Sequence, residues 1–268
     1  MAWRPITDQH AIERVRIVVT FEQNTPPKVV SRLGSIVDDR REYLGFEPMI
    51  RQEGFAIQIG PDPSVAVQQP QGVQGWQFQR VSEGNSIEVL SLLGNALSLE
   101  TADYDRWSKL LDRFTDLSSK LVETLLDLSD IASLSLEYFD RFYFTGEPEA
   151  AKPQDFLQEV SSAIPPAALD KGQLWHLHRG WFELEQHGRL LVNQNFDAQD
   201  GIVEDRPARS VQILTKADAR KGAWDIAEPD LRPHLDVMHK RVNQAFASVL
   251  SPEMRQAIRL EVDDLGAS

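Results

Sequence analysis

The sequence contains no cysteine among its 268 residues. Disulfides, thiolate zinc sites, iron–sulfur clusters and thiol nucleophiles are therefore excluded. The absence of thiols fits a reducing compartment, and a chain of this length can bury a substantial core without crosslinks or metals. The sequence therefore describes a domain that folds on apolar burial alone.

Long apolar runs are also missing. Charged and polar residues interrupt the N-terminal region up to Ile17, so no signal peptide can be read there. Nowhere do about 18 apolar residues follow one another, the length that a helix needs to cross a bilayer. We therefore expect a cytoplasmic protein with no membrane partner.

The common cofactor and catalytic motifs are absent as well. There is no Walker lysine loop and no dinucleotide glycine fingerprint, which would cradle phosphates, and no HExxH, nucleophile-elbow or kinase signature. We therefore expect no cofactor and assign no catalytic residue.

An excess of acidic residues gives the chain a formal net charge of −13. The mean field repels phosphate backbones and anionic lipid surfaces, so a nucleic-acid partner is disfavoured. The hydrophobic fraction of 41% and the charged fraction of 26% are ordinary for globular proteins, which argues against disorder.

Apolar spacing in the first half predicts strands and helices in alternation. Residues 14–21 alternate as a half-buried strand does, and residues 25–44 follow helical spacing up to Gly45. Residues 60–75 are rich in proline and glycine and are predicted to be mostly loop. The remaining elements are three meander strands over residues 76–81, 86–92 and 96–101, a helix over 103–128 and a long strand over 131–144.

A second series of elements follows the linker at residues 145–153. Its predicted elements are a helix near 153–164, strands near 173–185, 189–196 and 210–217, and a final helix over about 228–249. The predicted fold class is α+β, with antiparallel sheet and long amphipathic helices on one face. The halves 1–146 and 147–268 are expected to pack as one compact unit, and both duplication and coincidence explain their shared order.

Two pairs of polar residues are candidates for a ligand or polar site. Asp140 projects to the apolar face of its strand and must be paired, hydrogen-bonded or protonated, so Asp140 and Arg141 mark either a polar site or a structural ion pair. His176 and His178 lie two positions apart on a predicted strand and face the same side. No third ligand stands out, so we predict no metal site and interpret them as histidines on the wet side of a sheet.

Further candidates lie outside these pairs. His239, beside Met238 on the last helix, is either a base or a residue at the boundary between core and solvent. Of the tryptophans, Trp76, Trp175 and Trp181 are candidates for a surface that binds a partner, with core packing as the alternative.

Several segments together resemble one family. The chain carries TPP at residues 25–27, GWQF at 75–78, YDRW at 104–107, LEYFDRF at 136–142 and LDVMH at 235–239. In this combination it resembles a sporadically distributed family of uncharacterised bacterial proteins of similar length. That family usually has Asn-Arg where this chain has Asp140 and Arg141. The resemblance implies an accessory, defence-associated genomic island and transfers no catalytic residue.

These observations favour a non-enzymatic cytoplasmic interaction protein. We expect a regulatory, immunity-like or defence-associated subunit that binds a protein partner through an acidic surface bearing aromatic residues. The alternative is a small-molecule-binding or enzymatic domain with a pocket between sheet and helices, in which Asp140, Arg141, His176, His178 and His239 converge. A nucleic-acid mimic is a third interpretation, and self-association stays open.

Overall fold

The computed structural model describes residues 3–59, 66–158, 164–165, 174–203, 206–226 and 229–260. Within them the helices are α1 (Pro27–Asp38), α2 (Arg41–Leu44), α3 (Trp107–Leu126), α4 (Arg232–Ala247) and α5 (Pro252–Ala257), with 3-10 turns η1 (Pro148–Ala150) and η2 (Pro153–Asp155). The strands are β1 (Trp3–Pro5), β2 (Ile12–Phe21), β3 (Ile50–Ile59), β4 (Ala66–Ser82), β5 (Asn85–Leu93), β6 (Ala96–Thr101), β7 (Ile131–Phe144), β8 (Trp175–Glu185), β9 (Gly188–Val203) and β10 (Arg206–Trp224).

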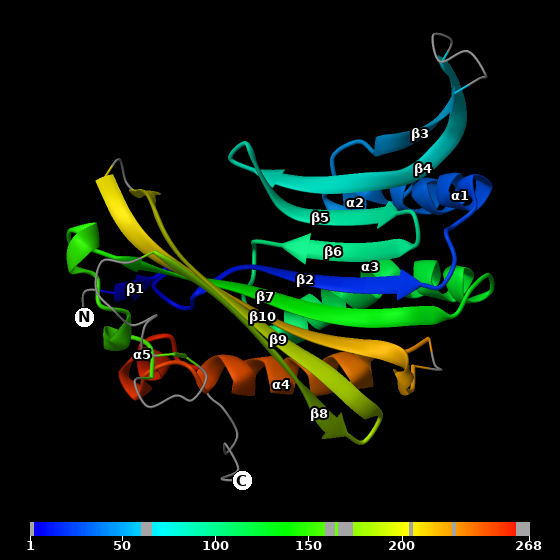
Figure 1. The fold of residues 1–268 in the computed structure, drawn as a ribbon. Coiled ribbons are helices and arrows are strands. Elements are labelled where there is room, and N and C mark those ends of the chain that lie inside the picture. The colour runs from blue at the N-terminus through cyan, green and yellow to red at the C-terminus, as the bar shows by residue number, and fades with distance from the viewer. Residues whose placement is uncertain are drawn as a thin grey trace. The chain divides into compact units, whose positions relative to one another are not determined.

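One antiparallel sheet contains all of these strands (Figure 1). Its order is β3-β4-β5-β6-β2-β7-β10-β9-β8, and β1 pairs with β7 outside this path. Strands that follow one another in the sequence are neighbours in two meanders, β3 to β6 and β8 to β10. In contrast, β2 and β7 pair with strands that are distant in the sequence. The sheet path ends at β3 on one side and at β8 on the other.

The predicted fold class is wrong, because sheet dominates the chain. Strands make up 47% and helices 29%, and the helices are few and mostly short. The strands are long: β4 has 17 residues, β9 has 16 and β10 has 19. The physical reason lies in the ends of these strands, which are polar and contain glycine. Such segments suggest loops when they are considered alone, but here they extend the hydrogen-bonded ladder with the neighbouring strand.

The chain divides into two compact units. Unit 1 comprises Met1–Arg16, Ser135–Ile226 and Leu231–Ser268, and unit 2 comprises Ile17–Leu134 and Ala227–Asp230. The division falls inside β2 and β7, so each of these strands contributes to both units. The predicted boundary at residue 146 lies instead in the linker after β7.

In unit 2, helix α1 packs closely against strand β4 of the meander. Pro27 opens α1, where a missing amide hydrogen costs nothing, and Val30 and Leu33 are buried. Trp76 Nε1 donates to the Val30 carbonyl at 3.0 Å. A side chain at Gly34 would meet Met49 and Trp76 at about 3 Å, so only glycine lets the helix approach this closely.

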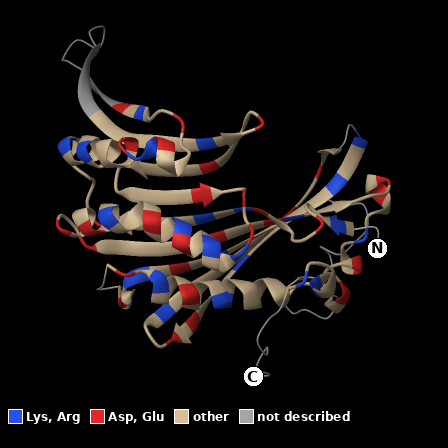
Figure 2. Ribbon diagram, turned by 180° about the vertical axis from the view of Figure 1, so that it is seen from behind, with Lys and Arg blue, Asp and Glu red and all other residues tan. Residues whose placement is uncertain are grey.

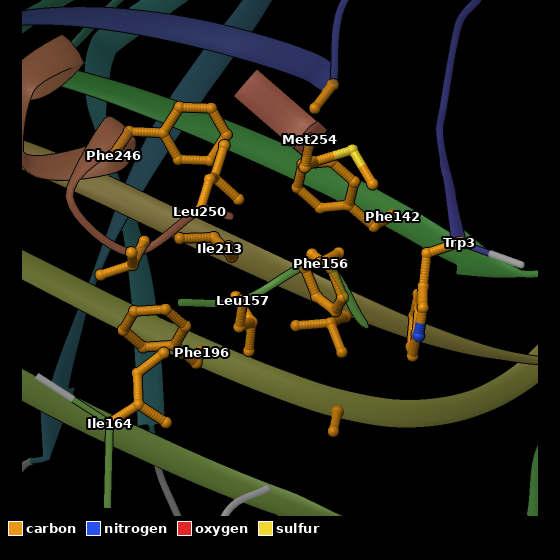
Figure 3. Close-up of a cluster of buried hydrophobic side chains, with 14 of the residues drawn as sticks. Trp3, Phe142, Phe156, Leu157, Ile164, Phe196, Ile213, Phe246, Leu250 and Met254 are labelled. Carbon is orange, nitrogen blue, oxygen red and sulfur yellow. The ribbon is translucent and has the colours of Figure 1, made fainter. Parts of the chain in front are cut away.

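Unit 1 is organised around one aromatic cluster (Figure 3). Phe156 is fully buried, with ring centroids 4.6 Å from Trp3 and 4.9 Å from Phe142. Phe246 of α4 lies over Phe142 with nearly parallel rings at 6.3 Å. Helix α4 also contacts β9 and β10, so this side of the unit 1 sheet is sealed by apolar packing.

Individual elements agree with the sequence better than the fold class does. The strand predicted over 131–144 is β7, and α3 lies inside the predicted helix at 103–128. The predicted loop at 60–75 is wrong over residues 66–75, which belong to β4. Proline is tolerated in this strand because Pro70 lies where β4 pairs only with β3, so the missing amide hydrogen can face the unpaired side. The predicted helix near 153–164 contains the short turn η2, and residues 159–163 lie outside the described residues.

In the described residues, no helix has the length and apolar composition needed to cross a bilayer. The cytoplasmic location stays a prediction.

Replacement of Phe156 by alanine is expected to destabilise the protein by about 3–5 kcal/mol, because it opens a cavity in a packed core. Urea unfolding followed by circular dichroism measures this. Tyr43, which is 84% exposed, provides the matched control, since Tyr43→Ala should cost less than about 1 kcal/mol. Equal effects of the two changes would contradict the assigned core.

Candidate functional site

The five polar candidates do not share one cleft. Asp140 lies on the β7 face that packs under α4, the helix that carries His239. Arg141 points to the opposite face and pairs with Glu13 of β2 at 2.9 Å. His176 and His178 are exposed on β8. The structure therefore brings Asp140 and His239 to one side of the unit 1 sheet and leaves the other three apart from them.

His239 belongs to a small hydrogen-bonded group beneath α4. Its Nδ1 lies 3.0 Å from the Tyr138 hydroxyl, and the Asn243 amide donates to its Nε2 at 3.1 Å. Burial lowers the pKa of His239 to about 4, against the opposing effect of the Asp236 carboxylate. The imidazole is therefore neutral at neutral pH, and it holds α4 in register with β7.

Asp140 lies between Tyr138 and Phe142 on the same face of β7. Its side chain is buried at 2% exposure, and within the described residues its Oδ1 has no hydrogen-bond partner. Burial alone raises the pKa of Asp140 well above the ordinary value for a carboxylic acid. Burial therefore favours the protonated acid over the carboxylate at this position.

The two β8 histidines pair across the strands with β9. His176 Nδ1 lies 2.6 Å from Asp197 Oδ1, and His178 contacts Asn195 in the same way. In the part of the chain that the structure describes, no three metal-ligating side chains form a group. Both histidines therefore contribute to cross-strand pairing on an exposed face.

A charged network crosses this open face of the unit 1 sheet, and sequence reasoning missed it. Glu137 is buried beneath its partners, Arg16 at 2.6 Å and Lys216 at 3.2 Å. Asp218 accepts from Ser135 Oγ at 2.6 Å and pairs with Arg220, also at 2.6 Å. Glu137 lies three residues from Asp140 on the opposite face, and this alternation in an otherwise apolar strand was the available signal.

The three candidate tryptophans have different environments. Trp76 is completely buried in unit 2, so it belongs to the core and offers no ring to a partner. Trp175 is half-buried against the aromatic cluster of unit 1. Trp181 is half-buried on β8, with the Arg179 guanidinium 4.5 Å above its ring and its Nε1 donating to Glu183 at 2.8 Å. Trp181 directly precedes the exposed Phe182, and Trp175 directly follows the exposed Leu174.

That exposed surface continues along β8. The burial of its 11 residues alternates strictly, and the outward row ends in Phe182, which is 60% exposed, and Leu184, which is 85% exposed. Burying such side chains against a partner is favourable by roughly 25 cal/mol per Å² of apolar area. Apolar groups at an open strand edge are therefore a candidate binding surface.

A pocket of about 400 Å³ lies beside the linker after β7. Its lining includes the basic side chains of Arg4 and Arg206, the acidic Glu147 and the ring of Tyr143. The mixture of charges is typical of a hydrated surface hollow, and none of the predicted candidates lines it.

No protein-family model and no curated protein matches this sequence. The resemblance to a sporadically distributed bacterial family accordingly stays a prediction.

Asp140→Asn should gain stability relative to the natural protein as pH rises from about 4 to 7. The raised pKa of folded Asp140 means that unfolding releases a proton in this window, so the natural protein loses up to about 1.4 kcal/mol per pH unit relative to the amide variant. Urea unfolding of both proteins at each pH measures the difference. A difference that stays constant over this range would contradict a neutral Asp140.

His239→Gln should remove a loss of stability at acidic pH. The lowered pKa of folded His239 means that unfolding takes up a proton below about pH 6.5, so the natural protein loses stability as pH falls toward 4, by at most about 3 kcal/mol. Thermal unfolding of both proteins between pH 7 and pH 4 measures this. An imidazole whose NMR signals titrate near pH 6.5 in the folded protein would contradict its burial.

Proposed function

We propose that this chain is a non-enzymatic interaction protein that binds a protein partner through strand β8. The observation that carries the proposal is a pair of exposed apolar side chains, Phe182 and Leu184, on the strand at the end of the described sheet path. An added strand gains main-chain hydrogen bonds at such an edge, and its side chains contact the row on the strand face.

The dispersal of the polar candidates supports this function over an enzymatic one. A catalytic site needs its acid, base and binding groups within hydrogen-bond reach of one substrate. Arg141 and His176 are instead occupied by Glu13 and Asp197 respectively.

The electrostatic character of the described residues also favours a protein partner. Acidic and basic residues are interspersed along the strands and helices (Figure 2), and the net charge of −13 repels nucleic acids. Mixed charge around exposed apolar groups is the usual composition of a protein interface, with an apolar centre and a polar rim. A regulatory or defence-associated role would require such a surface and little else.

The test is affinity purification of the tagged chain from its native cells, in parallel with the double variant Phe182→Ser/Leu184→Ser. We expect the variant to lose its bound partner, untagged copies of the chain included, by about tenfold or more, since two buried apolar contacts are removed. Tyr43→Ser is the matched control, because Tyr43 is 84% exposed in unit 2 and should leave binding intact. Equal recovery with both variants, or no bound protein at all, would refute the proposal.

A further inference from the structure

Strand β8 has one described neighbour. It pairs with β9 along its whole length, from Trp175 opposite Ala198 to Glu185 opposite Gly188, without a register shift. In an antiparallel ladder every second residue of such a strand directs its N–H and C=O groups away from its neighbour. The far side of β8 therefore presents a regular row of main-chain donors and acceptors to an incoming strand.

Three of the usual protections of an exposed edge, proline, lysine and a β-bulge, are missing from β8. Its sequence, WHLHRGWFELE, contains neither proline nor lysine, and its ladder has no bulge. Natural sheets use these features to prevent unwanted pairing. A strand of 11 residues without them is suited to pairing rather than protected against it.

The charges of β8 are unevenly satisfied. The Arg179 guanidinium, partly removed from water, donates to the neutral Gln194 amide at 2.9 Å and stacks on Trp181; among the described residues no carboxylate pairs with it. Glu183 lies further along the same face, within 3.3 Å of Arg241. The strand thus has a cationic first half and an acidic second half, which is the pattern that complements itself when reversed.

We propose that β8 pairs antiparallel with β8 of a second copy of this chain, with Trp181 opposite Trp181, so that two sheets become one. The inference deepens the proposed function and rests on it, because it names a second copy as the partner at this edge.

The register follows from the side chains. With the two-fold axis at Trp181, each Arg179 lies opposite Glu183 of the second copy, which gives two ion pairs on one face. Gly180 then lies opposite Phe182 of the second copy, so that an exposed ring covers a position without a side chain. Opposite charges and aromatic–glycine pairs are both favourable cross-strand combinations.

Neighbouring registers are poorer. Moving the axis to Gly180 places Arg179 opposite Trp181 and Leu177 opposite Glu183, so the ion pairs are lost. Moving it to Phe182 keeps an ion pair between Arg179 and Glu185 but shortens the overlap. Registers in between turn the apolar row to the wrong face, because side chains alternate along a strand.

A symmetric pairing also ends with two copies. The same patch serves on both chains, so that each β8 edge covers the other and no edge of this kind remains for a third copy. An unrelated extended peptide would have to bring its own complement to Arg179 and Gly180.

The first measurement is the mass of the unaltered protein by sedimentation and native mass spectrometry. We expect a doubled mass at micromolar concentration and a return to the single mass in Leu184→Lys, which places a charge in the apolar row at the edge. A single mass for the unaltered protein at about 100 μM, where a specific interface of this kind should be filled, would overturn the inference.

The second measurement uses the absence of cysteine from the chain, since any new thiol is then unique. Trp181→Cys should form a covalent dimer under mild oxidation, because the two Cβ atoms face each other across the axis at a distance that a disulfide spans. Phe182→Cys is the matched control. Residue 182 faces Gly180 of the second copy, so this variant should form no more covalent dimer than the unaltered protein. Crosslinking through residue 182 in place of residue 181 would overturn the register.

The two proposals fail differently. A monomer that still captures a different protein, with the capture lost in Phe182→Ser/Leu184→Ser, overturns self-pairing and leaves the proposed function standing. A monomer that captures nothing overturns both.

Discussion

The constraint on which this structure depends is that buried main-chain groups must find hydrogen-bond partners, and here a single antiparallel sheet provides them. Strand β7 shows it most clearly, because every residue from Leu134 to Asp140 is buried. A strand covered on both faces can be satisfied only by neighbouring strands, so the ladders on either side of β7 fix where the long strands run. At the ends of the described sheet path, β3 and β8 each pair with one described strand, so the main-chain groups on their other sides have no described strand partner.

Burial on both faces of β7 also explains two acidic residues with opposite chemistry. Glu137 lies on the face where Arg16 and Lys216 supply positive charge, so its carboxylate is paired although it is little exposed. Asp140 lies on the apolar face under α4, where burial raises its pKa and favours the protonated form. His239 on that face is neutral for the same reason. The surroundings of a charged residue on this strand are therefore set by the face on which it lies.

The sequence predicted local elements better than their combination. Residues 131–144 alternate clearly and 107–126 have helical spacing, so both were identified. The full lengths of β9 and β10 were not identified. Their polar ends form strands only because they pair with each other, and the sequence of either end does not show this. Among site residues, Asp140 was recognisable as a charge in an apolar row. Glu137 could be noticed in the same way, but the network around it could not, because its partners come from β2 and β10 and no local pattern links residues so distant in sequence.

The proposed function depends on the strand at the end of the described sheet path. An edge strand with regular ladder geometry, exposed apolar groups and self-complementary charge is a surface prepared for another strand. Amide hydrogen exchange, measured by mass spectrometry at two protein concentrations, tests this most directly. The account predicts that β7 amides are protected at both concentrations. The β8 amides that point away from β9 should be protected when the protein is concentrated and exchange quickly when it is diluted. Exchange of β8 that does not depend on protein concentration, with no added partner, would contradict it.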